Sequence, residues 1–330
     1  MSCKYFFKRD IYTVFYAISL VLFLLPAGRM AAQCQGAKDI EEWGTFDNWV
    51  VREFKESAVI GGKMRYLYET AKGDTIKGRV PYKNAPHCVW ANSNVFAVVS
   101  GVTKGSCTVF PEKRGNGYCA RLETRMERVK AIGIININVI ASGTIYLGQM
   151  HEPIKNTKNP QSKLNSGISF TDRPAGVTFD YKATVGNNRM RASGGSPKEL
   201  HDNDYADCIV MLQKRWEDEN GNIYALRVGT AFKRITESTS DWINGYFLKI
   251  NYGDITNEPF YKEYMKLIPE DESNYAINSK GESVPIIECG WGTADDVPTH
   301  IIMRFSSSHG EAYVGDINNR LWIDNVKITY

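Results

Sequence analysis

Short strand-like segments separated by turn residues are the feature that most constrains the fold of this chain. From residue 45 onward, Val, Ile, Thr and aromatic residues recur with a period of two, and clusters of Gly, Asn and Asp separate the runs. Such alternation is typical of strands that bury one face. The runs lie at residues 107–110, 119–124, 134–147, 177–181, 208–216, 223–232, 246–252, 300–305 and 321–330. We therefore predict an all-β protein, an antiparallel β-sandwich of jelly-roll type with long decorated loops.

The clearest predicted hairpin joins residues 208–216 to residues 223–228. Its turn contains Asn220-Gly221, which adopts the positive backbone angles of a tight reversal at low cost. Only residues 258–267 have a convincing helical pattern, so we expect at most one or two short helices. The polar stretch 155–167 fits either a domain boundary or a long loop, and we favour one domain over residues 41–330.

The first 33 residues have the parts of a secretory signal. Three cations (Lys4, Lys8 and Arg9) precede an apolar run at 11–25, and Pro26, Gly28 and small residues follow it. An uncleaved anchor is the alternative, but 15 apolar residues are fewer than the roughly 20 that span a bilayer. We expect export to the periplasm, the cell surface or the medium. Residues 34–40 then form a short linker, and lipidation of Cys34 is a less favoured alternative because Gln33 precedes it.

Removal of the signal changes the charge balance. The whole chain has a net charge of +3, but residues 1–33 hold four cations and one anion, so 36 basic and 36 acidic residues remain. A neutral chain without a basic stripe argues against a nucleic-acid partner. The six remaining cysteines show neither CxxC pairs nor zinc spacing. Cys107 and Cys119 flank a predicted turn and are the best candidates for a disulfide, although free buried thiols are favoured.

Standard catalytic motifs are absent, which leaves carboxylates as a route to catalysis. The sequence has no GxSxG, HExxH, P-loop or dinucleotide-binding pattern. Glycoside hydrolysis needs two carboxylates across the scissile bond, and Glu123 with Asp204 or Asp207 is the candidate pair. The segment 201–207 (HDNDYAD) places oxygen ligands at alternate positions, as a calcium site does, but a capped turn is the favoured interpretation.

Several segments together resemble the PCMD family, a carbohydrate metabolism domain of exported proteins in Gram-negative glycan-utilisation systems. Residues 44–49 (GTFDNW) are similar to the Gly-x-Phe-Glu-x-Trp opening of jelly-roll carbohydrate-binding modules. The other matching segments are 90–94, 117–125, 142–148, 167–174, 179–182, 207–212, 305–310 and 321–326. The resemblance covers roughly residues 41–330, and the order of the segments makes it specific. It departs from the family pattern at Asp47, where Glu is usual, and at residues 316–319.

The resemblance implies a galactose-binding-like β-jelly roll that binds carbohydrate without established catalysis. In similar jelly rolls, acidic residues near the first strand and on the last strand hold a structural calcium. Asp47 and Asp324 are the matching positions, and hydrogen bonds between the two ends of the domain are the competing interpretation. No other cofactor is expected.

We therefore expect a non-catalytic protein that binds a glycan, or supports a glycan-processing assembly, at the cell envelope. An exposed indole ring stacks on a sugar face, and polar neighbours bond its hydroxyl groups. The candidate binding residues are Trp90, Asn92, Glu123, Arg125, Arg173 and Lys182. Structural pairing of the three cations with Glu123 and Asp172 is the competing interpretation. The alternative functions are a glycoside hydrolase or lyase that uses the carboxylate pair above, and a structural or adhesive component of a surface assembly.

Overall fold

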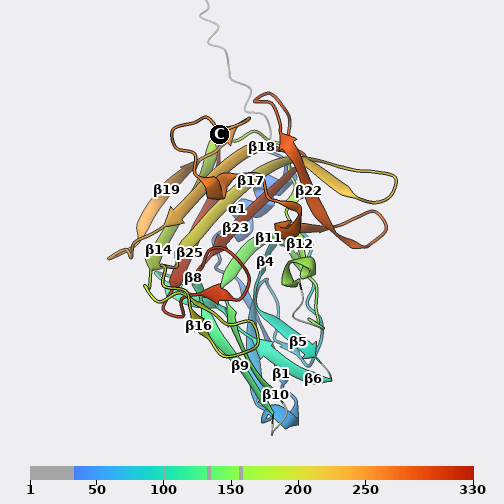
Figure 1. The fold of residues 1–330 in the computed structure, drawn as a ribbon, viewed down its shortest axis with the longest axis vertical. Coiled ribbons are helices and arrows are strands. Elements are labelled where there is room, and N and C mark those ends of the chain that lie inside the picture. The colour runs from blue at the N-terminus through green and yellow to red at the C-terminus, as the bar shows by residue number, and fades with distance from the viewer. Residues whose placement is uncertain (1–32, 100, 132–134, 156–158) are drawn as a thin grey trace, which may run out of the picture. The chain divides into compact units, whose positions relative to one another are not determined.

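Two β-sheets pack face to face in the computed structural model, which describes residues 33–99, 101–131, 135–155 and 159–330 (Figure 1). The predicted signal lies almost entirely outside these residues. In the described chain, the larger sheet has the strand order β12-β11-β23-β17-β18-β22-β21, with β4, β13 and β20 paired to its members. Its strands are β4 (Trp90–Asn92), β11 (Thr144–Met150), β12 (Leu164–Ser166), β13 (Ile168–Ser169), β17 (Ala206–Glu217), β18 (Ile223–Ile235), β20 (Asn251–Tyr252), β21 (Tyr275–Ile277), β22 (Ser283–Trp291) and β23 (His300–Ser306).

The smaller sheet has the order β19-β14-β25-β8-β7 in the same residues. Its strands are β7 (Val109–Arg114), β8 (Gly117–Glu123), β14 (Gly176–Thr184), β19 (Ile243–Lys249) and β25 (Arg320–Thr329). Short strands pair outside the two sheets: β1 (Trp49–Lys55) with β2 (Met64–Thr70) and β3 (Ile76–Lys77), β5 (Val95–Val99) with β6 (Val102–Ser106), β9 (Arg125–Ala131) with β10 (Ile135–Ala141), and β15 (Met190–Arg191) with β16 (Lys198–Glu199) and β24 (Val314–Gly315). The 3₁₀ helices are Ala58–Ile60, Pro160–Lys163, Glu263–Met265 and Glu270–Glu272.

The predicted all-β sandwich is confirmed, with two differences in detail. β18 pairs with β22, and β1 with β3, in parallel rather than antiparallel register. The predicted run 134–147 is divided into β10 and β11 by Ser142-Gly143. Only glycine fits at this break, because a Cβ on Gly143 would lie 2.4 Å from the backbone nitrogen of Glu123.

The predicted hairpin is present and is formed by β17 and β18, which pair from Ala206 with Ile235 to Glu217 with Ile223. The Asp218 side chain accepts hydrogen bonds from the backbone N–H groups of Asn220 and Asn222, and Gly221 has a positive φ of 88°. Gly221 therefore has the predicted positive backbone angle but Asn220 does not, and the Asp218 side chain, which was not singled out from the sequence, also holds the turn.

The described chain has one short α-helix, within the predicted number, but not at the predicted position. Residues 258–267 contain only the 3₁₀ turn Glu263–Met265, whereas the predicted linker 34–40 begins the helix α1 (Gln35–Trp43). Ala37, Ile40 and Trp43 recur at every third position and are buried against the sandwich. Gly44 ends the helix where a Cβ would lie 2.6 Å from the Val326 carbonyl oxygen. The helix is therefore part of the core.

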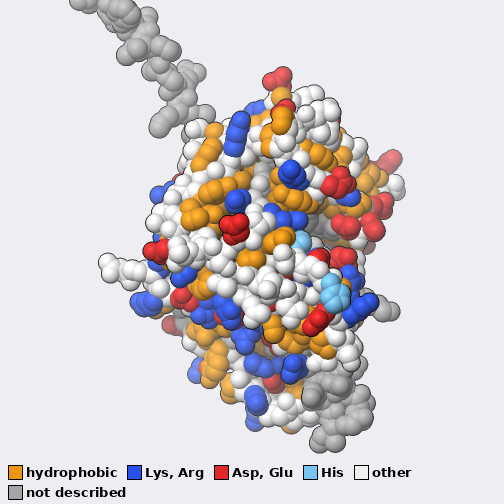
Figure 2. Space-filling view, turned by 60° about the vertical axis from the view of Figure 1, so that its left-hand side comes forward, with side chains coloured by type: hydrophobic (Ala, Val, Ile, Leu, Met, Phe, Trp, Pro, Cys, Tyr) orange, Lys and Arg blue, Asp and Glu red, His pale blue; other side chains and the backbone are white. Residues whose placement is uncertain are grey.

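The face shown in Figure 2 carries lysines, arginines and carboxylates interspersed with hydrophobic side chains. This mixture agrees with the neutral charge count of residues 34–330. None of the helices in the described part of the chain has the length and apolar character needed to cross a membrane.

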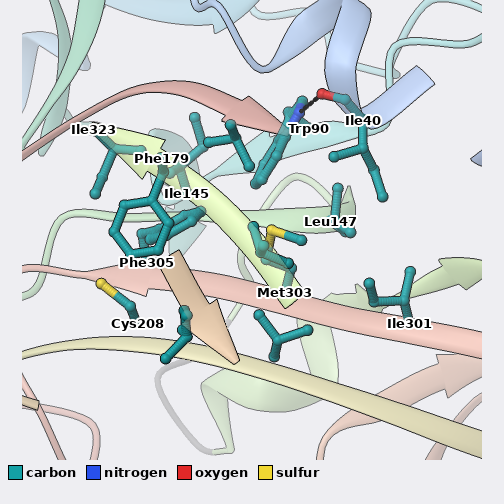
Figure 3. Close-up of a cluster of buried hydrophobic side chains, with 14 of the residues drawn as sticks. Ile40, Trp90, Ile145, Leu147, Phe179, Cys208, Ile301, Met303, Phe305 and Ile323 are labelled. Atoms are coloured by element: carbon teal, nitrogen blue, oxygen red, sulfur yellow. Dashed lines mark hydrogen bonds between the residues drawn. The ribbon is translucent and has the colours of Figure 1, made fainter. Parts of the chain in front are cut away.

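The main hydrophobic core lies between the two sheets (Figure 3). Phe179 of the smaller sheet contacts Phe305 of the larger sheet edge to face, with ring centroids 5.0 Å apart. Trp90 packs against Phe305 and Phe46, and its indole N–H donates to the Ile40 carbonyl oxygen of α1 at 3.2 Å. This tryptophan thus joins the helix to the larger sheet within the core.

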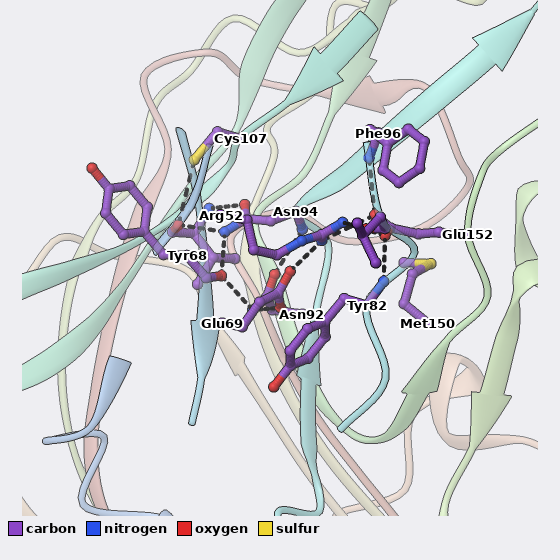
Figure 4. A network of polar contacts seen from close by, with 12 residues as sticks. Arg52, Tyr68, Glu69, Tyr82, Asn92, Asn94, Phe96, Cys107, Met150 and Glu152 are labelled. Atoms are coloured by element: carbon purple, nitrogen blue, oxygen red, sulfur yellow. Dashed lines mark hydrogen bonds and ion pairs between the residues drawn. The ribbon is translucent and has the colours of Figure 1, made fainter. Parts of the chain in front are cut away.

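A buried ion cluster attaches the β1-β2 pair to the rest of the chain (Figure 4). Arg52 of β1 lies between Glu69 of β2 and Glu152, with N–O distances of 2.6 and 2.5 Å. Glu152 also accepts from the backbone N–H of Phe96, and Asn92 donates to Glu69. Burial, opposed by Arg52, raises the pKa of Glu69 to about 8. One cation thus serves two carboxylates, and Glu69 holds a proton at neutral pH.

This proton makes stability depend on pH. A carboxyl group whose pKa is raised by folding stabilises the folded chain at low pH, and the contribution decreases as pH rises from the unfolded pKa towards 8. We expect Glu69→Gln to remove this decrease, so the difference in unfolding free energy between E69Q and the parent protein should change by more than about 1 kcal/mol between pH 5 and pH 8. Denaturant unfolding at both pH values measures it. Glu53→Gln, at a half-exposed carboxylate of β1, should follow the parent, and an E69Q profile parallel to the parent would refute the assignment.

The candidate disulfide between Cys107 and Cys119 is not formed. Cys107 and Cys119 are free, as are the other described cysteines. The β7-β8 hairpin pairs Cys119 with Glu112, while Cys107 lies before β7 begins. Burial raises the pKa of both thiols to about 12, so they are neutral, as the favoured interpretation has it.

Candidate functional site

A groove with a volume of about 590 Å³ runs along the outer face of the larger sheet. Its floor is formed by β11 and β23, and its walls by the β5-β6 pair, the β9-β10 pair and the loop 308–313. The volume lies within the range of small-molecule binding sites in proteins. The groove therefore is the first candidate for a ligand site in the described chain.

The period of two along each strand builds the floor of this groove. On β23, Met303 and Phe305 point into the core, so Arg304 and Ser306 point outward. The pairing of β23 with β11 and β17 sets Thr144, Ser306 and Asp207 in one row and Tyr146, Arg304 and Ile209 in the next. Thr144 and Ser306 share a hydrogen bond of 3.0 Å between their hydroxyl groups.

Several buried polar atoms of the groove lack a partner in the described chain. These atoms are the Tyr146 hydroxyl, the Ser106 hydroxyl and the Gln161 side-chain oxygen. Burial, with a contribution from Glu69 and Glu152, raises the pKa of Tyr146 well above its ordinary value, so the phenol is protonated. Buried polar groups are nearly always hydrogen-bonded in proteins. Three unsatisfied polar atoms that line one groove therefore favour a ligand site there.

Most charges in the groove are already paired. Glu127 contacts Lys104 at 3.6 Å, and both oxygens of Asp207 accept from Arg234 at 2.8 Å. Glu311 pairs with Arg191 at the rim. The carboxylates are thus neutralised by the protein itself.

Comparison with known proteins adds the family. Residues 46–242 match the model of the family described as Putative carbohydrate metabolism domain, PCMD. This chain belongs to the PCMD family. The resemblance noted in the sequence is therefore confirmed, and the match covers more than half of the chain.

Two solved structures are similar to this PCMD chain. A putative glycoside hydrolase from Bacteroides vulgatus ATCC 8482 has a TM-score of 0.44 and 15% identity over 86% of this chain and 96% of that one. A putative glycoside hydrolase from Bacteroides thetaiotaomicron VPI-5482 has a TM-score of 0.42 and 19% identity. The match covers 68% of this chain but only 57% of the length of that protein. No curated protein matches the sequence.

The structure places two predicted binding residues of the PCMD domain in its interior. Trp90 is 1% exposed, so its ring packs in the core and cannot stack on a glycan. Asn92 is also buried and donates to the Tyr68 carbonyl oxygen and to Glu69. These two assignments were wrong, because residue type alone does not distinguish a packed indole from an exposed one.

Glu123 and Arg125 lie together, away from the groove. Glu123 points out of the smaller sheet, on the side opposite to buried Leu122, and contacts Arg121, Arg320 and Arg125 at 3.1, 3.4 and 3.8 Å. The competing interpretation, in which Arg125 pairs with Glu123, is thus the observed arrangement. A carbohydrate contact by either residue stays a prediction.

Lys182 and Arg173 occupy separate positions. Lys182 lies over the Trp322 ring at 5.4 Å on the outer face of the smaller sheet. Arg173 lies over the Tyr252 ring at 4.3 Å and donates to the carbonyl oxygens of Ala294 and Asp296, not to Asp172. The six predicted residues therefore do not form one site.

The predicted catalytic pairs do not form in the described chain. Asp207 points outward from the larger sheet and Glu123 outward from the smaller one, so the core separates them. Asp204 is 0% exposed and accepts from the Asp316 backbone N–H and the Asn319 amide. A completely buried carboxylate with these partners cannot reach a substrate.

The residues suggested for calcium do not fit a cation. Arg114 donates to Asp324 at 2.6 Å, so a guanidinium occupies the place of a metal, and Asp47 accepts from the Tyr118 backbone N–H. Asp204 in the segment 201–207 is held as described above. In the described residues, no group of three or more His, Cys, Asp or Glu side chains could hold a metal ion.

Sequence reasoning missed the groove. Its floor residues Thr144, Tyr146, Arg304 and Ser306 come from strands more than 150 positions apart. Alternation in residues 300–305 could have identified Arg304 as an outward polar residue between buried neighbours. The partner strand could not be read from the sequence.

Proposed function

We propose that this PCMD protein is an exported, non-catalytic carbohydrate-binding protein of a glycan-utilisation system and that the groove on the larger sheet holds the glycan. The observation that carries the proposal is a groove in a carbohydrate-metabolism domain whose lining includes three buried polar atoms without a partner, those of Ser106, Tyr146 and Gln161.

The mixture of groups in the groove supports a saccharide ligand. Saccharides present hydroxyl groups at their edges and C–H groups on their ring faces. The groove offers hydroxyl groups of Thr144 and Ser306 beside apolar side chains such as Val95, Ile154 and Ile302. A largely apolar lining with a few polar groups is typical of ligand sites.

The state of the carboxylates supports binding without hydrolysis. A glycosidase uses one carboxyl group as an acid and a second as a nucleophile or base. Glu127 and Asp207 line the groove, but each is held by a cation of the protein. We therefore propose that neither carboxylate acts on a glycosidic bond.

Export is supported by residues 1–33, whose cations, apolar run and small residues have the order of a secretory signal. We infer that the mature chain works at the cell envelope or outside it, where polymeric glycans are met. A glycan-processing assembly is the partner class that fits this location.

Narrowing the groove tests the proposal. Ala312 is an exposed residue of the groove wall, so Ala312→Trp should fill space without disturbing the core. Calorimetric titration of residues 34–330 with a panel of neutral and acidic oligosaccharides should find a ligand, and A312W should weaken it about tenfold or more. Ala58→Trp, at an exposed alanine outside the groove, is the matched control and should bind like the parent. A folded protein that binds no saccharide, or equal loss in both variants, would refute the proposal.

A further inference from the structure

Arg304 differs from the other charged residues of the groove. Lys104, Glu127, Asp207, His309 and Glu311 each have an ion-pair partner. Arg304 has neither a hydrogen bond nor an ion pair among the described residues, although it lies in the middle of the floor, between Tyr146 and Ile209. Its five N–H donors are therefore available to a ligand.

Keeping this guanidinium unpaired is unfavourable for the folded chain. Burial lowers the pKa of Arg304 below its usual value, opposed by the nearby carboxylate of Asp207. Asp207 accepts two hydrogen bonds from Arg234 and, in the described chain, none from Arg304. A half-buried cation without a partner lowers stability, and such costs are typical of functional positions.

The neighbours of Arg304 define what would satisfy it. Across β11 lies the unpartnered hydroxyl of Tyr146, and Ser306 and Thr144 form the next row. Ile209 and Ile302 supply apolar surface beside them. A planar guanidinium pairs with a carboxylate through two parallel hydrogen bonds, which is the strongest arrangement open to it.

We propose that Arg304 makes the groove selective for saccharides that carry a carboxylate, which means uronate-containing glycans. The inference rests on the proposed function, since it names the ligand class of the same groove. The carboxylate accepts two parallel hydrogen bonds from the Arg304 guanidinium, and the ring hydroxyl groups contact the side chains of Thr144 and Ser306. Because the other charged residues that the structure describes in the groove are paired, Arg304 is the one charge that the groove presents to a ligand. A saccharide whose only charged group is a carboxylate matches it.

Matched pairs of oligosaccharides test this selectivity. The probes are tetrasaccharides of galacturonate, mannuronate and guluronate, and the same compounds with their carboxyl groups reduced to neutral hexoses. At least one acidic probe should bind about tenfold or more tightly than its reduced form. Arg304→Gln should remove that difference, and Arg304→Lys should keep only part of it because an ammonium lacks the planar fork. Arg79→Gln, at an exposed arginine that donates to the Lys55 carbonyl oxygen, is the control and should keep the parent preference.

Thermal unfolding separates this role from a structural one. R304Q removes an unpaired, half-buried charge, so its melting temperature should be equal to or higher than that of the parent while its affinity for the acidic probe falls. A structural arginine would lower both. A variant that loses the acidic preference only because it unfolds would therefore contradict the inference.

The outcomes also distinguish this inference from the proposed function. If neutral saccharides bind as tightly as acidic ones, and if A312W lowers the affinity for both, the role of Arg304 is overturned. The proposal that the groove binds a glycan then stands. A sulfated carrageenan tetrasaccharide, which has no carboxylate, is the remaining probe. If it alone bound in an Arg304-dependent way, the carboxylate assignment would be wrong. Absence of binding to every probe would overturn both.

Discussion

Replacing Arg52 by alanine is expected to lower the free energy of unfolding by about 3–5 kcal/mol, because the change leaves the buried Glu152 carboxylate without its cation and removes the hydrogen-bond donor to Glu69. Arg52 and Glu69 are 2% and 3% exposed, and the Glu152 side chain is 1% exposed. Neither carboxylate can be reached by water without opening the β1-β2 pair. Chemical denaturation of the R52A and parent proteins at pH 7 measures the loss.

A triple variant identifies the cause of that loss. Arg52→Met combined with Glu69→Gln and Glu152→Gln removes all three ionisable groups, and the amides keep oxygen acceptors for Phe96 and Asn92. This variant should be more stable than R52A by at least about 1 kcal/mol, since the stability effects of mutations at contacting residues of one network do not add. If R52A costs less than about 1 kcal/mol, or if the triple variant is the least stable protein of the set, the cluster does not hold β1 and β2 in the way described.

Trp90→Ala is the second change with a large expected effect. It should lower the free energy of unfolding by about 3–5 kcal/mol, because it removes a buried indole and leaves a cavity between α1 and both sheets. Trp90→Phe keeps an aromatic ring against Phe46 and Phe305 but loses the hydrogen bond to Ile40, so a loss of about 1–3 kcal/mol is expected.

The Trp90 variants also decide between core packing and sugar stacking. W90F should bind saccharide as the parent does, once it is assayed well below its melting temperature. A W90A protein of unchanged stability that had lost saccharide affinity would restore the stacking role predicted from sequence. Denaturation and calorimetry on the same preparations give both readouts.

The fold class was accessible from sequence because strand periodicity is local. Residues 208–216 and 223–232 alternate, and an Asp and a Gly in the turn between them fix the hairpin. The helix α1 was missed because its nine residues are too few for a clear periodic signal, although Ala37, Ile40 and Trp43 do recur at every third position. Residues 258–267 have helical spacing, but only one 3₁₀ turn forms there.

The site was less predictable because it depends on contacts distant in sequence. Trp90 and Asn92 have the residue types of a sugar site, but α1 and β2 cover them, and neither element was placed by the sequence. Arg304 becomes notable only after β11 and β17 are set beside β23 and no partner is found for its guanidinium. Register and the lack of a partner are properties of the assembled sheet.

The most direct test of the central claim, glycan binding in the groove, is amide hydrogen exchange of residues 34–330 with and without the tightest oligosaccharide. The groove predicts slower exchange on binding in β5, β6 and residues 308–313, which form its walls, with the β7-β8 hairpin unchanged. Protection confined to β7, β8 and β25, on the outer face of the smaller sheet beside Glu123 and Trp322, would place the saccharide elsewhere and contradict the account.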